Sequence, residues 1–79
     1  MTVIAKVIKS DVKRSGANFV LENNGLIFEA SFDAPLGSLY KYMIKNTKPG
    51  KSVKIGYDEL SVVLNNNPIA IKSIDFIAA

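Results

Sequence analysis

Lysine side chains dominate one segment of the chain, residues 41–54, which holds five of them and no acidic residue. Ammonium groups neutralise phosphates but do not read bases, so this segment predicts salt-dependent, largely sequence-tolerant binding of a polyanion. A tyrosine inside the segment could offer its ring for base stacking. The alternative is an ordinary solvated surface rich in lysine. We name the candidate polyanion-binding residues the lysine ridge: Lys41, Tyr42, Lys45, Lys48, Lys51 and Lys54, with Lys13 and Arg14 as secondary contacts.

Charge is distributed unevenly over the rest of the chain. The 79 residues carry a net charge of +3. Residues 1–14 are basic, whereas residues 15–40 contain three acidic residues and no basic one. A local concentration of positive charge is what a binding footprint requires, and an even spread would only solubilise the protein.

Groups suited to catalysis are scarce. The sequence has no cysteine and no histidine, so it lacks a thiolate nucleophile and the commonest general base and metal ligand. Asp58-Glu59 is more typical of a turn than of a metal site, because no further ligands accompany the pair. Residues 49–52 lack the first glycine and the spacing of a phosphate-binding loop. We therefore expect a protein that is not an enzyme and needs no cofactor or metal.

The length of the chain allows one domain, residues 1–79, with a single small core. The sequence begins with a strand-like run and lacks a basic region followed by a long apolar stretch, so no signal peptide is expected. No apolar run approaches the ~18 residues that cross a bilayer. These features predict a small soluble protein in the cytoplasm, without membrane contact.

A β-hairpin is the clearest local structure in the sequence. Two alternating apolar runs flank Asn24-Gly25, a strong signal for a two-residue turn. Such a turn pairs Leu21 with Phe28, and a slip of one residue would expose half of the apolar side chains. With this register, one face of the hairpin carries the core candidates Phe19, Leu21, Leu26, Phe28, Ala30 and Phe32.

Further strands are expected on both sides of the hairpin. Residues 2–9 alternate as a strand, and a change of apolar parity after them requires a bulge or bend near Ser10-Asp11. Residues 52–57, 60–64 and 69–77 are the later strand candidates, the last with a second bulge near its middle. Two features precede these strands. Leu36, Leu39, Tyr40 and Met43 have the spacing of one face of a helix, and Lys48-Pro49-Gly50-Lys51 predicts a type II turn.

The order of these elements predicts a mainly β fold. We expect a small, closed or nearly closed antiparallel barrel of five to six strands, with one short helix between strands three and four. This layout resembles the OB-fold, and the closing stretch KPGKSVKIGY…VVLNNNPIAIKSIDF is similar to the end of small phage single-strand-binding proteins of that fold. An SH3-like barrel and an open α+β sheet are the alternatives.

The resemblance implies binding of single-stranded DNA or RNA on the outer face of strands two and three. In this sequence that face has two glutamates and no aromatic residue, which does not suit a phosphate backbone. We therefore place a nucleic acid or other polyanion on the lysine ridge instead. The residues of the outer face are Asn18, Val20, Glu22, Ile27, Glu29 and Ser31.

A second hypothesis uses apolar residues on the outside of the barrel. Charged residues surround them, and an exposed apolar patch with a charged rim is typical of a protein interface. The protein would then be an interaction module, such as a phage- or plasmid-type adaptor or inhibitor, or a homodimer. Scattered single apolar residues would need no functional explanation. The candidate interface residues are Ile4, Ile8, Val20 and Ile27.

Overall fold

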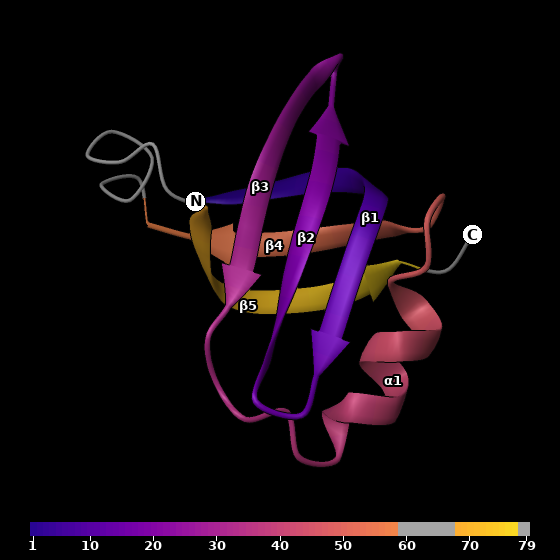
Figure 1. The fold of residues 1–79 in the computed structure, drawn as a ribbon. Helices are drawn as coiled ribbons and strands as arrows, with labels where there is room; N and C mark the ends of the chain where they lie inside the picture. The colour runs from indigo at the N-terminus through magenta and orange to yellow at the C-terminus, as the bar shows by residue number, and fades with distance from the viewer. Residues whose placement is uncertain (59–67, 78–79) are drawn as a thin grey trace.

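Five strands and one helix make up the fold in the computed structural model, which describes residues 1–58 and 68–77 (Figure 1). The strands close into a barrel in the order β1-β2-β3-β5-β4, and β4 pairs back onto β1. The predicted small, mainly β barrel with a helix between the third and fourth strands is confirmed, and the open sheet is excluded. The elements are β1 (Thr2–Lys13), β2 (Gly16–Asn23), β3 (Leu26–Phe32), α1 (Leu39–Asn46), β4 (Ser52–Tyr57) and β5 (Ile69–Ile77).

One strand pair contradicts the prediction of a wholly antiparallel barrel. β5 runs parallel to β3, joined at Ala30↔Ile69 and Ser31↔Ala70, while the other four neighbouring pairs are antiparallel. The reason is parity: strand direction alternates around an antiparallel ring, so a ring of five strands must contain a parallel pair. The additional strand predicted for residues 60–64 lies outside the described residues.

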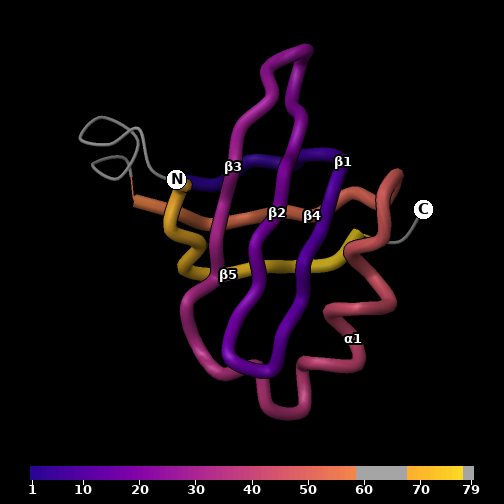
Figure 2. The backbone as a smooth tube through the Cα atoms, viewed as in Figure 1, coloured from indigo at the N-terminus to yellow at the C-terminus, as the bar shows by residue number. Residues whose placement is uncertain are grey.

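The hairpin of β2 and β3 has the predicted register. Leu21 lies opposite Phe28, and the turn residues Asn24 and Gly25 have φ angles of 51° and 83°, as a type I′ turn requires. Leu26 is an exception to the predicted core, because its side chain is 68% exposed. Figures 1 and 2 show the cause: the tip of the hairpin extends beyond the other strands.

β1 contains the expected bulge, but two residues earlier than predicted. Val7 pairs with Leu21 and Lys9 pairs with Val20, which leaves Ile8 as the extra residue. Before the bulge β1 pairs with β4, and after it β1 pairs only with β2. The bulge therefore lies where β1 passes from one wall of the barrel to the other.

The turn between α1 and β4 is fixed to this bulge. The N–H of Val7 donates to the carbonyl of Lys51 at 2.7 Å, and the N–H of Gly50 donates to the carbonyl of Val7 at 2.8 Å. The turn has the predicted type II form, since Gly50 has a φ of 95° and the N–H of Lys51 donates to the carbonyl of Lys48. These bonds set the position of the lysine-rich turn against β1.

The helix is held by its apolar side. Met43 is fully buried and Tyr40 packs partly against the core, whereas Leu39, also predicted to be buried, is exposed. The hydroxyl of Thr47 donates to the carbonyl of Met43 and closes the last turn. The buried core comprises Ala5, Val7, Ala17, Phe19, Leu21, Ala30, Leu36, Met43, Val53, Ile55 and Ile71.

Met43→Ala tests whether this one side chain anchors α1. We expect the free energy of unfolding to fall by about 2–5 kcal/mol, because the change removes buried apolar atoms and leaves a cavity. Ile44→Ala, next in the helix but exposed, is the control and should cost about 1 kcal/mol or less. Urea denaturation followed by circular dichroism measures both. Equal losses in the two variants would contradict the proposed anchor.

Candidate functional site

The lysine ridge begins on the outward side of α1. At about 3.6 residues per turn, Lys41 and Lys45 lie on the side of the helix opposite the buried Met43, and both are exposed. Tyr42 is 61% exposed and lies to one side of them. The side-chain amide of Asn46 donates to the backbone carbonyl of Tyr42, so this bond does not involve the tyrosine ring.

A second row of helix residues faces β1. Tyr40, Ile44 and Lys48 are spaced by four residues. Tyr40 and Ile44 lie on the same side of the helix, and Lys48 comes just after its C-terminal end. α1 and the second half of β1 lie side by side and run in opposite directions (Figure 1). The guanidinium carbon of Arg14, just after β1, lies 4.7 Å from the centre of the Tyr40 ring, within the range of a cation–π contact.

Between the helix and β1 lies a shallow groove of about 310 Å³. Its apolar lining comes from both elements and from the Pro-Gly turn, and one cation, Lys48, lies among these residues. Arg14 lies toward the other end of the helix, stacked on Tyr40. The lining residues are Ser10, Val12, Ile44, Lys48 and Pro49.

The structure thus places part of the lysine ridge on or beside one helix. Lys41, Lys45, Lys48 and Arg14 all lie on or beside α1, and Lys51 follows in the turn that is fixed to β1. Lys54 lies apart, on β4, where its register neighbours are Ile4 and Asp75.

Lys13 differs from the cations on α1 because it lies close to a carboxylate. Its ammonium group lies 4.0 Å from the carboxylate of Asp11, so part of its charge is already compensated. Within residues 1–58 and 68–77, Lys13–Asp11 and Lys72–Asp58 are the ion pairs found at 4 Å or less. The cations on and beside α1 therefore have no carboxylate within that distance among the described residues.

Sequence reasoning missed Tyr40 as a site residue. Its place in the apolar helical stripe predicted a core role, and it is indeed half-buried. The signal that could have revealed it is the four-residue spacing of Tyr40, Ile44 and Lys48, in which two largely apolar side chains are followed by a lysine.

The four residues of the apolar alternative do not form one continuous patch by register. Ile4, Ile8 and Ile27 are exposed and Val20 is half-buried. Charged residues lie between them on the outer face. The cross-strand rows read Lys6, Glu22, Ile27 and then Lys9, Val20, Glu29.

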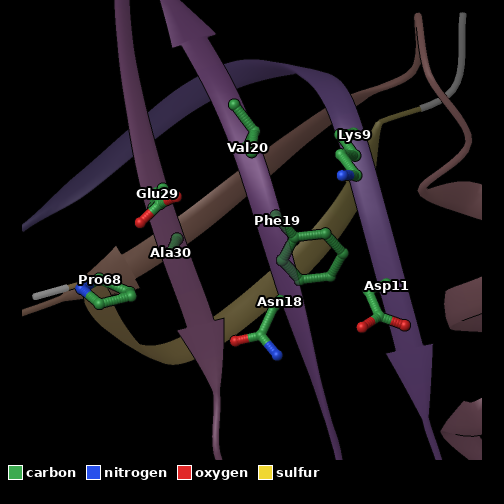
Figure 3. Close-up of a pocket in the computed structure, with 8 residues that line it drawn as sticks. All are labelled: Lys9, Asp11, Asn18, Phe19, Val20, Glu29, Ala30 and Pro68. Atoms are coloured by element: carbon green, nitrogen blue, oxygen red, sulfur yellow. The ribbon is translucent and has the colours of Figure 1, made fainter.

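The outer face of β1, β2 and β3 is hollowed into a depression of about 290 Å³ (Figure 3). Figure 3 shows Lys9 and Asp11 on β1, Asn18 and Val20 on β2, and Glu29 on β3 around it. Lys9 faces Glu29 and Asp11 here, and Asp11 also lies near Lys13, so the hollow has no excess of cations to attract a phosphate chain. The remaining lining residues are Phe19, Ala30 and Pro68.

The second ion pair lies at a bulge in β5. The sequence predicted a bulge in this part of the strand. Gly56 pairs with Ser73 and Tyr57 with Ile71, so Lys72 is the extra residue. Its ammonium group lies 2.7 Å from the Asp58 carboxylate. The hydrogen bond and the charge of Lys72 lower the pKa of Asp58 below its ordinary value.

Lys72→Ala should raise the pKa of Asp58 toward the ordinary aspartate value, because the main cause of the shift is removed. In the wild type the lowered pKa favours folding above the ordinary aspartate pKa, and this contribution is lost as pH falls through the lowered value. NMR titration of the Asp58 carboxyl carbon measures the change. Lys54→Ala is the control, and an unchanged Asp58 titration in Lys72→Ala would contradict the assignment.

The described residues contain no cluster of three or more potential metal ligands, and none of their helices is long and apolar enough to cross a membrane. No family model, curated protein or solved structure was found to match the chain.

Proposed function

We propose that this protein is a non-enzymatic, OB-type module of the cytoplasm that binds single-stranded nucleic acid through the lysine ridge. Two features support the OB assignment. The strand order β1-β2-β3-β5-β4 closes on β1, and the helix lies between β3 and β4. A five-stranded Greek-key barrel of this kind commonly binds oligonucleotides.

The observation that carries the proposal is the group of uncompensated cations around α1. Lys41, Lys45, Lys48 and Arg14 have no carboxylate within 4 Å among residues 1–58 and 68–77. Like charges gathered without counterions raise the local positive potential, which attracts a polyanion and accelerates its association. The hollow on the outer face of β1, β2 and β3 has no comparable excess of cations.

Binding would combine phosphate contacts with stacking. Lysines on the outward side of α1 neutralise phosphates, and the exposed ring of Tyr42 accepts a base beside them. Each phosphate neutralised on a single strand lowers the slope of log K against log salt by about 0.7. Contacts of this kind predict weak discrimination between base sequences and between DNA and RNA.

Fluorescence anisotropy with labelled oligo(dT) and oligo(rU) of about 15 nucleotides tests the proposal. Lys41→Glu/Lys45→Glu should weaken binding at low salt by at least tenfold and flatten the salt slope by about 1.4, the value for two lost phosphate contacts. The matched control is Lys6→Glu/Lys9→Glu, which changes the net charge equally on the outer face of β1.

Two outcomes would overturn the proposal. One is the absence of binding by the wild type at low salt. The other is an equal loss of affinity in the ridge variant and the control, which would mean that net charge alone governs binding.

Exposure of Ile4, Ile8 and Ile27 favours a second candidate, a protein-interaction module. These isoleucines would contact a different protein, as in an adaptor or inhibitor, or a second copy of the chain packed on the outer sheet face. The charged residues between these side chains would have to be paired or remain at the rim of such an interface. This candidate is favoured if the wild type fails to bind nucleic acid.

A further inference from the structure

Among the described residues, β3 has one free backbone edge over its first half. β2 pairs with β3 along its whole length, from Ala17↔Phe32 to Asn23↔Leu26. On the other side, β5 reaches only Ala30 and Ser31. Residues 26–29 therefore have no strand partner on that side within the part of the chain that the structure describes.

The hydrogen-bonding groups that face this edge follow from the turn. In a hairpin with a two-residue turn, the residues that flank the turn form a hydrogen-bonded pair, and the pairs alternate from there. Leu26 and Phe28 therefore direct their backbone groups toward β2. Ile27 and Glu29 direct theirs outward, to the unpaired edge.

Of the four edge residues, only Glu29 carries a charge. Natural edge strands are commonly blunted by lysine, proline, a bulge or a covering element. Here residues 26–28 are Leu-Ile-Phe, and Leu26 and Ile27 are 68% and 62% exposed at the protruding tip of the hairpin (Figure 2). Open hydrogen-bonding groups flanked by apolar side chains are suited to the addition of another strand.

We infer that a second copy of this chain pairs with the β3 edge, antiparallel and about a twofold axis at Ile27. In this register Ile27 of one copy lies opposite Ile27 of the other. The backbone groups of both residues point out of their hairpins and exchange two hydrogen bonds. Leu26 lies opposite Phe28 of the second copy, so apolar side chains meet on both faces of the sheet. Glu29 lies opposite Gly25 of the second copy, so no like charges are opposed.

The next register along the strand fits less well. An axis at Phe28 places Ile27 opposite the carboxylate of Glu29. It also brings the second strand against Ala30, whose neighbour is already Ile69. Self-complementarity at Ile27 is what favours a second copy over an unrelated peptide.

The paired edge is short, so the dimer is expected to be weak and dependent on concentration. Interfaces well below about 1,000 Å² support transient association, not permanent assembly. This inference does not rest on the proposed nucleic-acid binding, since neither the edge nor its test involves the lysine ridge.

Sedimentation velocity of the full chain from ~0.02 to ~1 mM, without nucleic acid, tests the inference. The mean mass of the wild type should rise with concentration toward that of a dimer. Leu26→Lys should abolish this rise, because it places a charge opposite Phe28. The control is Ile4→Lys, another exposed apolar residue, on β1, which β2 separates from β3 in the sheet, and it should associate as the wild type does.

Glu29→Pro tests the backbone contribution separately. By the alternation above, its N–H bonds nothing in β2, so proline should block the edge while it preserves the hairpin. Hydrogen exchange supplies a second readout that needs no variant: the amides of Ile27 and Glu29 should gain protection as wild-type concentration rises. A wild type that stays monomeric throughout overturns the inference. So does association that Ile4→Lys abolishes and Leu26→Lys leaves intact.

Discussion

The fold depends on how the backbone of Val7 is bonded at the bulge of β1. One strand must serve both walls of a five-stranded barrel, and it can do so only if it bends where it leaves β4 and continues along β2. At that point Val7 bonds Lys51 and Gly50 of the Pro-Gly turn. The same two hydrogen bonds thus hold the barrel strand at its bend, position the end of α1 and place Lys51 beside β1.

The odd number of strands also determines how β3 is paired. Five strands close only through a parallel pair, and here that pair, β3 with β5, spans two residues on each strand. A contact this short leaves the first half of β3 beyond the region that β5 covers. Among the described residues, the free edge of β3 therefore results from how little of the strand this closing contact covers, and Leu26 and Ile27 are exposed beside it.

Features fixed by local chemistry could be predicted from the sequence. The hairpin register follows from side-chain parity, and the turn at Pro49-Gly50 follows from two residues with restricted backbones. Features that depend on the ends of neighbouring elements could not. The position of the β1 bulge is set by the turn that bonds Val7. Leu26 has the core pattern, but no element that the structure describes covers it. The missed cation–π contact joins Arg14 and Tyr40 across the gap between a strand and a helix.

The cations around α1 differ in how much order a ligand must impose on them. A lysine loses much of its side-chain freedom when it holds a phosphate, so part of its attraction is offset by entropy. Arg14 is already stacked on Tyr40 and has a planar guanidinium that can make two parallel hydrogen bonds. The lysines on the helix should therefore govern long-range attraction and its dependence on salt. Arg14 was named from the sequence only as a secondary contact, but its guanidinium already lies over the Tyr40 ring. Under the proposed function it would therefore hold a phosphate with the smallest loss of side-chain entropy in this group.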